Sequence, residues 1–478
     1  MIKKKNILRV SVLCMALLFG GQAFAKDVSA EQVIEELTEE LDSPDPDGGH
    51  YREAREQSSP RRARMRMKAS STRGWYGSQL ASGNEQAFYD ALLEKSGQLS
   101  EMTAAYAAYK QKTGSVDGTF VSITLSDPVT CVWAERYQNA DYLELYMAFN
   151  RATHAFIKDY PEYFWLGSFT IGFHAAKNSD GTHTLKGIKL SPAEYYEGLM
   201  TDDFGITAEA LQAAIAAVGS QDTAYDTVKA AHDYTVNLIN YGNAGQGYGH
   251  VITGALLQKY EHTAVCEAYA KLFCLLCREN GINCITINGG AKRDSNGNIV
   301  ADHMWNYVQI DGFWYLVDAT WDDTLTTKAY FLAGAESAAY SSTKTVSDNH
   351  MPVGIFSTDD SQAEYAAFSV PAWSELSYEE RNTVLTPEKD RLTLKVGETG
   401  DLSSVDSTFH ESTTRVTCSY ESSDKKVVTV DSKGKVTAAG VGTAEITITS
   451  SVLSKVKTTV SVTVEAAVPE TEPATEPV

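Results

Sequence analysis

The stretch HMWNYVQIDGFWYLVDAT, residues 303–320, decides the architecture of the middle of the chain. Two runs rich in β-branched and aromatic residues flank the pair Asp311 and Gly312, which is favoured by tight type I′ turns. The pattern predicts two antiparallel strands, residues 303–310 and 313–320, joined by a two-residue turn. A turn of this length fixes which residues of the two strands lie opposite one another.

The predicted register brings a histidine and an aspartate together. Counting outward from the turn, Ile310 lies opposite Phe313, and Trp305 lies opposite Asp318. His303 and Asp318 then become diagonal neighbours on one face of the sheet, about 7–8 Å apart at the backbone. At that separation the imidazole reaches the carboxylate, whereas a one-residue bulge in either strand would prevent the contact.

A cysteine precedes a predicted helix upstream of this hairpin. Cys266 is followed by residues 267–279, in which Ala270, Phe273, Cys274 and Cys277 form one apolar stripe at helical spacing. The thiol is therefore expected at a helix N-terminus, where the partial positive charge of unpaired amides favours the nucleophilic thiolate.

These three residue types are the parts of a nucleophilic mechanism. A thiol that attacks an amide needs a base to take its proton, and the base needs a carboxylate to orient it. Cys266, His303 and Asp318 supply these parts in this sequence. On spacing alone, a structural cysteine in the core of a helix is the competing interpretation.

Three blocks of sequence resemble the core of the transglutaminase-like family, in the family's order. The blocks are AVCEAYA at residues 264–270, DHMWNYV at 302–308 and GFWYLVDATWD at 312–322. The resemblance implies that Cys266 is the nucleophile, His303 the base and Asp318 its orienting carboxylate. Ala268 stands where the family usually has glycine, and Met304 replaces a commoner alanine, but neither position carries a catalytic atom.

The pattern of apolar residues predicts an α+β fold. Apolar residues recur at helical spacing through residues 81–225, which we interpret as a helical N-terminal region, whereas the period changes towards two between residues 282 and 321. Helices followed by strands are typical of helices packed on an antiparallel sheet. We assign residues 226–375 to this catalytic core, and the resemblance implies a papain-like or transglutaminase-like arrangement.

The C-terminal part of the chain has a different composition. Short alternating runs rich in Thr, Val and Ser predict a small all-β sandwich over residues 385–465. The stretches at 422–431 and 434–444 resemble the group 2 bacterial immunoglobulin-like domain. Residues 466–478 form a Pro/Thr/Glu tail that is too polar to pack.

The N-terminal 80 residues indicate export. Residues 1–25 read as a signal peptide with a basic start, an apolar run and Ala23-Phe-Ala25 at the cleavage site, and residues 26–80 read as a flexible polar leader. A retained membrane anchor is the competing interpretation, but the apolar run is shorter than the ~20 residues that span a bilayer. We expect a secreted, extracellular protein, or one associated with the cell surface, with no membrane span after cleavage.

Charge and cysteine content exclude several classes of partner. The formal net charge of -21 disfavours nucleic acid and anionic lipid. Cys274 and Cys277 have C-x-x-C spacing, but they lack the second pair that a zinc site needs. We therefore expect no metal site and no cofactor.

Three further residues are candidates for substrate binding. Trp305 and Trp165 would wall a tunnel for the acyl group, although aromatic residues in such positions are more often part of the core. The oxyanion of an acyl-transfer reaction would be held by the backbone amide of Cys266 and one side chain, for which Tyr241 is a weak candidate.

Two functions remain open at the level of sequence. The first is a cysteine enzyme that forms a thioester, resolved by an amine as an acyltransferase or by water as an amidase or peptidase, on peptides or cell-surface proteins. The second is a catalytically silent binding or adhesion protein that uses the core as a scaffold. In either case the immunoglobulin-like domain is a candidate for binding a cell-wall or surface polymer.

Overall fold

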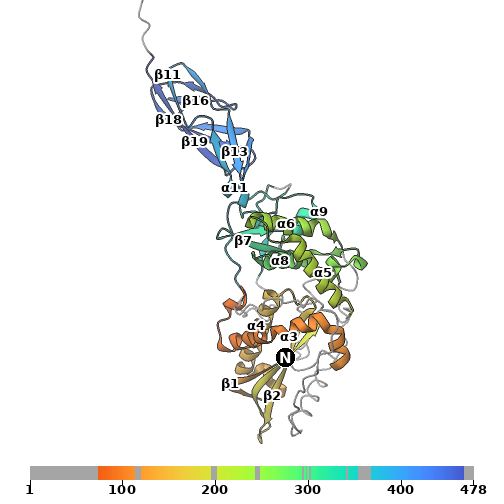
Figure 1. The fold of residues 1–478 in the computed structure, drawn as a ribbon. Helices are drawn as coiled ribbons and strands as arrows, with labels where there is room; N and C mark the ends of the chain where they lie inside the picture. The colour runs from red at the N-terminus through yellow and green to blue at the C-terminus, as the bar shows by residue number, and fades with distance from the viewer. Residues whose placement is uncertain are drawn as a thin grey trace, which may run out of the picture. The chain divides into compact units, whose positions relative to one another are not determined.

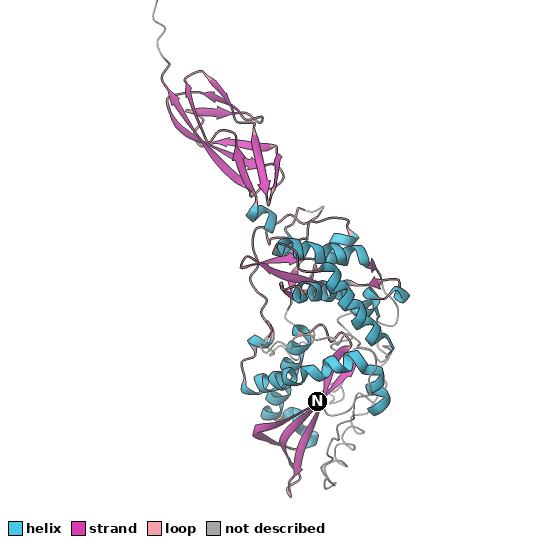
Figure 2. Ribbon diagram, in the orientation of Figure 1, coloured by secondary structure: helices cyan, strands magenta, loops and turns pink. Residues whose placement is uncertain are grey.

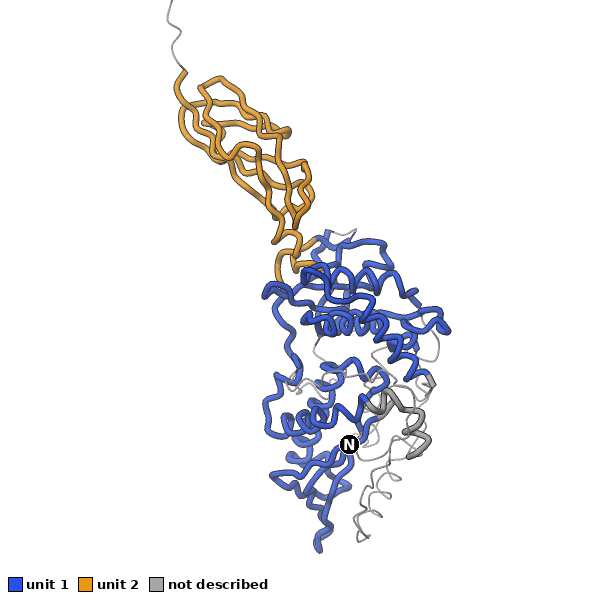
Figure 3. Tube along the Cα trace, in the orientation of Figure 1, with its two compact units in different colours: residues 1–331, 338–373 blue, residues 332–337, 374–478 orange. Residues whose placement is uncertain are grey.

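The computed structural model describes residues 74–113, 120–194, 202–242, 248–292, 295, 297, 299–300, 303–340, 343–353 and 368–467. The chain divides into two compact units (Figure 3): Met1–Phe331 with Ala338–Trp373, and Leu332–Ser337 with Ser374–Val478. The expected signal peptide at 1–25, the leader at 26–80 up to residue 73, and the tail beyond residue 467 lie outside the described residues. Within the described ranges, no helix is both long enough and apolar enough to cross a membrane.

The first part of unit 1 combines helices with a sheet. Its elements are η3 (Gly77–Gln79), α3 (Gly83–Thr113), β1 (Val121–Cys131), η4 (Trp133–Gln138), α4 (Ala140–Asp159), β2 (Leu166–Lys177) and β3 (His183–Glu194). The strands form a three-stranded antiparallel sheet in the order β1-β3-β2. The expectation of a helical region at 81–225 is therefore incomplete. Phe169, Ile171 and Phe173 alternate with small or polar residues, and this period of two builds β2.

The second part of unit 1 is the α+β core that the sequence predicts. Its helices are α5 (Asp202–Val218), α6 (Ala224–Leu238), η5 (Tyr248–His250), α7 (Ile252–Leu256), η6 (Gln258–Tyr260), α8 (Cys266–Glu279), α9 (Ala319–Thr324) and α10 (Val346–Asn349). Its strands are β4 (Asn240–Tyr241), β5 (Thr263–Ala264), β6 (Asn283–Gly290), β7 (His303–Ile310), β8 (Phe313–Val317) and β9 (Met351–Pro352). The larger sheet is antiparallel, in the order β8-β7-β6-β9. Helix α8 packs on β6 and β7, and α6 packs on α8 (Figure 1).

The hairpin of β7 and β8 has the predicted register. Ile310 pairs with Phe313, and the ladder continues outward from this pair without a bulge. Asp311 and Gly312 have φ angles of 52° and 82°, so both central residues of the turn are left-handed, as type I′ requires. Strand β8 ends at Val317 rather than at residue 320, because Asp318 leaves the sheet to cap helix α9.

Unit 2 is rich in strands, as predicted (Figure 2). A short helix, α11 (Tyr378–Asn382), precedes β10 (Val384–Pro387), β11 (Arg391–Lys395), β12 (Thr399–Asp401), β13 (Val405–Phe409), β14 (Ser412–Arg415), β15 (Cys418–Ser422), β16 (Val428–Val430), β17 (Lys435–Ala438), β18 (Gly442–Ser450) and β19 (Lys457–Glu465). They form sheets in the orders β10-β13-β14, β11-β19-β18-β15 and β12-β17-β16. Inward-facing Val, Ile and Leu side chains of these strands build a core separate from that of unit 1.

Candidate active site

Cys266 is the first residue of α8, as the sequence predicts. The N-cap residue, Val265, has an apolar side chain that makes no hydrogen bond to the helix, so it does not occupy the backbone N–H groups of the first turn. The cysteine is 8% exposed. Its thiol therefore combines a helix N-terminus, which favours negative charge, with a residual opening to solvent.

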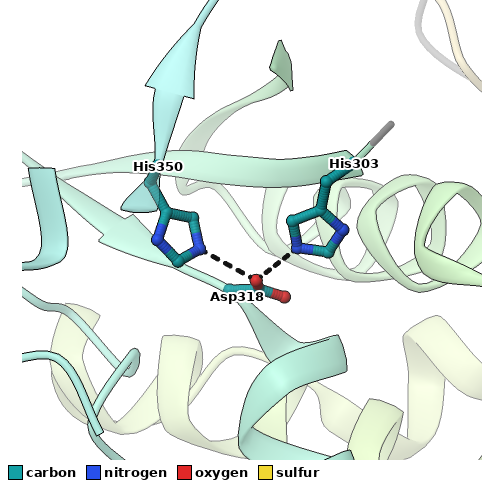
Figure 4. A group of neighbouring side chains, drawn as sticks. All are labelled: His303, Asp318 and His350. Carbon is teal, nitrogen blue, oxygen red and sulfur yellow. Dashed lines mark hydrogen bonds and ion pairs between the residues drawn. The ribbon is translucent and has the colours of Figure 1, made fainter. Parts of the chain in front are cut away.

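His303 contacts both other members of the predicted constellation. Its Nε2 lies 2.5 Å from Oδ2 of Asp318 (Figure 4), and its ring also interacts electrostatically with the side chain of Cys266. Because Nε2 is occupied by the carboxylate, Nδ1 is the nitrogen left for the sulfur. The imidazole stacks on Trp321 with ring centroids 5.2 Å apart, which fixes its plane.

The charges of this group favour an ion pair. Burial alone lowers the pKa of His303, but the charge and hydrogen bond of Asp318 and the contact with Cys266 outweigh it and raise that pKa to about 10. Burial raises the pKa of Asp318, yet the charges and hydrogen bonds of His303 and His350 hold it well below its usual range. At neutral pH the pair is therefore imidazolium and carboxylate, and a proton is already stored beside the sulfur.

Asp318 is fully engaged by its surroundings. Its Oδ1 accepts hydrogen bonds from the backbone N–H groups of Thr320 and Trp321, at 3.0 and 3.1 Å. Its Oδ2 accepts from His303 and, at 3.0 Å, from Nε2 of His350. The residue is 1% exposed. One carboxylate therefore has two roles: Oδ1 caps α9 and Oδ2 orients the histidine.

His350 is the member of the site that the sequence analysis missed. It is completely buried and follows α10, 32 residues beyond Asp318. No periodic pattern or turn connects it with the hairpin, because its place beside the carboxylate depends on how the chain after α9 folds back. The sequence contains no local signal that would have identified it.

The side chains of His303, Asp318 and His350 are close enough to be tested as a metal site, because their ligand atoms lie within 4.8 Å of one another. Two ligands bonded at about 2.0–2.1 Å in tetrahedral or square geometry are about 2.9–3.4 Å apart. The 2.5 Å between His303 Nε2 and Asp318 Oδ2 is shorter than this range. The arrangement fits a shared proton better than a coordinated metal ion.

Neighbouring side chains hold α8 against the sheet and α9. Asn306, which is 1% exposed, donates from Nδ2 to the carbonyls of Ala270 and Ile285 at 3.0 and 3.3 Å. The hydroxyl of Tyr269 lies 2.6 Å from Oδ2 of Asp323. These bonds connect α8 to β6, β7 and α9, so Cys266 and His303 are carried on elements that are fixed to one another.

The three predicted substrate-binding residues lie in different surroundings. Trp305 is 1% exposed and its ring is 5.8 Å from that of His303, so it forms a buried wall behind the histidine. Trp165 is completely buried and packs near Phe204, in the core. Tyr241 is 56% exposed and pairs with Ala264, two residues before the cysteine.

Comparison with known proteins supports the assignment of the core. Residues 211–319 match the transglutaminase-like superfamily, and residues 383–464 match the group 2 bacterial Ig-like domain. The chain contains a transglutaminase-like core. The matched part of this core ends directly after Asp318 and includes Cys266 and His303.

The chain also has a short similarity to curated relatives. The kyphoscoliosis peptidases of Mus musculus and of Homo sapiens are each 40% identical over 78 residues, which is 14% of this chain and 12% of the relative. A solved structure described as a TGase is 15% identical, with a TM-score of 0.22, and the match covers 36% of this chain and 48% of that one. The chain thus spans about an eighth of the length of these curated relatives.

Proposed function

We propose that this protein is a cysteine enzyme that attacks carboxamide or peptide bonds through a thioester on Cys266. The observation that carries the proposal is His303, which is buried, lies 2.5 Å from Asp318 and interacts electrostatically with the side chain of Cys266. A buried core cysteine, the competing interpretation, has no need of an oriented imidazolium. The match to the transglutaminase-like superfamily supports the same conclusion.

The first half of the reaction forms the thioester. The thiolate of Cys266 attacks the carbonyl carbon, and the oxygen becomes an oxyanion facing the N-terminus of α8, where the backbone amide of Cys266 is the expected donor. Tyr241 is the candidate for a second donor. The tetrahedral intermediate collapses as His303 gives its proton to the leaving nitrogen, so ammonia or a peptide amine departs and the imidazole is left neutral.

The second half restores the enzyme. Neutral His303 takes a proton from an amine or a water molecule as that group attacks the thioester carbon, and the sulfur leaves as thiolate beside the new imidazolium. Asp318 keeps the ring in one orientation through both halves. An amine acceptor gives a cross-link and water gives hydrolysis. Both outcomes use the same three side chains.

We further propose that the enzyme acts outside the cell on peptides or surface proteins. The signal-like segment at residues 1–25 supports export. The match of residues 383–464 to a bacterial Ig-like domain supports a second binding function, towards a cell-wall or surface polymer.

The test compares wild-type protein with Cys266→Ala and with Cys418→Ala, a control thiol that lies in unit 2. Each is incubated with a glutamine-containing protein and a labelled primary amine, and ammonia, incorporated label and new peptide ends are measured. We expect activity in the wild type and in Cys418→Ala and none in Cys266→Ala. Label with ammonia identifies a transferase, and new ends or ammonia alone identify a hydrolase. Equal results for all three proteins across a broad substrate panel would favour the silent scaffold.

A further inference from the structure

Asp318 is held by two histidines, of which the proposed mechanism uses only one. Figure 4 shows the rings of His303 and His350 on opposite sides of the same carboxylate, with their Nε2 atoms directed at it. His350 lies 3.0 Å from Oδ2 and is completely buried. A histidine in such a place needs an explanation, because burying a polar ring is unfavourable unless its hydrogen bonds are made.

The protonation state of His350 follows from its partners. Burial outweighs the attraction of Asp318 and lowers the pKa of His350, so the ring is neutral at pH 7 and carries one N–H. Since the carboxylate only accepts, that hydrogen is on Nε2. Nδ1 is then an acceptor, and it lies 2.8 Å from Oδ1 of Asn349, whose Nδ2 donates to the hydroxyl of Tyr330 at 3.4 Å. Turning the Asn349 amide over exchanges its oxygen and nitrogen and gives the neutral ring a donor at Nδ1. Every polar atom of the ring has a partner in this arrangement.

Aromatic side chains fix the plane of His350. Its ring lies 4.6 Å from Trp321, 5.0 Å from Trp305 and 5.1 Å from Tyr330, measured between centroids. Trp321 also stacks on His303, so one indole positions both imidazoles. These contacts hold the His350 ring in place, so the hydrogen bond from His350 to Asp318 is kept only while the carboxylate stays in its present orientation.

We propose that His350 is a positioning residue that locks the catalytic carboxylate. Two backbone amides anchor Oδ1 of Asp318, and the Nε2–H of His350 anchors Oδ2 at the point where it meets His303. The extra donor also shares the negative charge of Oδ2, so the proton between the pair stays on His303. The proposal rests on the triad function given above.

His350 is not a second general base. Its Nδ1 faces Asn349 and its Nε2 faces the carboxylate, so neither nitrogen is directed at the sulfur. It acts on Cys266 only through Asp318 and His303.

The experiment uses three variants of the full chain. His350→Ala removes the donor, and His350→Gln replaces it with an amide N–H that reaches the same oxygen. His232→Ala is the matched control, because His232 is 2% exposed and pairs with a different carboxylate, Asp322, at 3.1 Å. Alkylation of Cys266 by iodoacetamide at neutral pH is followed by peptide mass mapping, which requires no substrate, and kcat and KM are measured on whichever amide the wild type uses. Thermal unfolding is measured for each variant.

We expect His350→Ala to slow alkylation of Cys266 and to lower kcat about tenfold, the effect of one charge-assisted hydrogen bond, with KM unchanged. His350→Gln should return both rates to within about twofold of the wild type. His232→Ala should lose stability as His350→Ala does, and keep the wild-type rates.

Rates for His350→Ala equal to those of the wild type would overturn the proposal. Equal slowing in His350→Ala and His350→Gln would also overturn it, because packing rather than donation would then explain the effect. Slow labelling of Cys266 and no activity in the wild type itself would instead refute the proposed function, and so is distinct from either result.

Discussion

Replacing Asp318 with asparagine is the most informative single change at this site. Asparagine has the same shape and is a good helix N-cap, so its oxygen can keep the two backbone N–H groups that start α9. Its amide nitrogen then occupies the position of Oδ2, opposite the Nε2 atoms of His303 and His350. A donor there forces His303 to carry its hydrogen on Nδ1, towards Cys266, where a base is needed.

The size of the effect follows from the electrostatics of the pair. The rise in the pKa of His303 from 6.5 to about 10 corresponds to about 5 kcal/mol of preference for the protonated ring, at about 1.4 kcal/mol for each pH unit. Without the carboxylate, the largest effects that favour the protonated ring are lost, whereas the burial that disfavours it remains. We expect kcat of Asp318→Asn to fall about 10,000-fold, as for a triad whose histidine is in the wrong tautomer.

The same pair makes stability depend on pH in a defined window. Because the folded-state pKa of His303 is raised, its contribution is fully present below 6.5 and is lost as the pH rises to about 10. Because the pKa of Asp318 is lowered, its contribution is present above 3.8 and is lost as the pH falls further. The unfolding free energy of the wild type should therefore exceed that of Asp318→Asn by about 3–5 kcal/mol between pH 3.8 and pH 6.5.

The assay is chemical denaturation of both proteins over a series of pH values, together with Cys266 alkylation at neutral pH. The difference in unfolding free energy should shrink steadily from pH 6.5 towards pH 10. Asp318→Asn with wild-type alkylation, or with a stability difference that does not change with pH, would refute the ion pair and the role assigned to the carboxylate.

Three further predictions concern the elements that carry the site. A Cβ on Gly289 would lie 2.1 Å from a main-chain oxygen of β9, so Gly289→Ala should cost more than about 2 kcal/mol of unfolding free energy. Gly83→Ala is the control and should be nearly neutral, because nothing lies within 4 Å of a Cβ there. Equal denaturation midpoints for the two variants would contradict this prediction. Tyr269→Phe removes the 2.6 Å bond to Asp323 and should cost about 1.5–3 kcal/mol in urea unfolding, with a change below about 0.5 kcal/mol as the opposing result. Burial, and to a smaller extent the ammonium group of Lys271, lowers the pKa of Lys158 from 10.5 to about 7. The contribution of Lys158 to the unfolding free energy therefore rises with pH between those values, and Lys158→Met should remove this rise. Denaturation midpoints that change with pH in the variant as they do in the wild type would contradict this prediction.

The sequence predicted those parts of the site that depend on local rules. Asp311 and Gly312 determine the turn, the turn determines the register, and the register places His303 near Asp318. The stripe of apolar residues after Cys266 is equally local, because helical spacing is visible within one segment. Both expectations are confirmed in the fold, although their catalytic meaning stays a prediction.

The parts that were missed depend on competition or on distant contacts. Asp318 can continue the strand or cap a helix. Strand β8 ends at Val317 because the Asp318 side chain accepts hydrogen bonds from two backbone N–H groups at the start of α9. His350 reaches the site only because the chain beyond α9 returns to the sheet as β9. The sequence pattern predicts helix where β1, β2 and β3 lie, because short apolar runs fit either period.

The double duty of Asp318 affects how related sequences should be read. A carboxylate that starts a helix remains useful to a protein that has lost its chemistry, since removing an N-cap typically costs about 1 kcal/mol. An aspartate at this position in a homologue is therefore weak evidence of an active enzyme. The contacts described above give Cys266 no comparable structural role. A serine or alanine at its position in a homologue would therefore be stronger evidence that the protein has lost its catalytic activity.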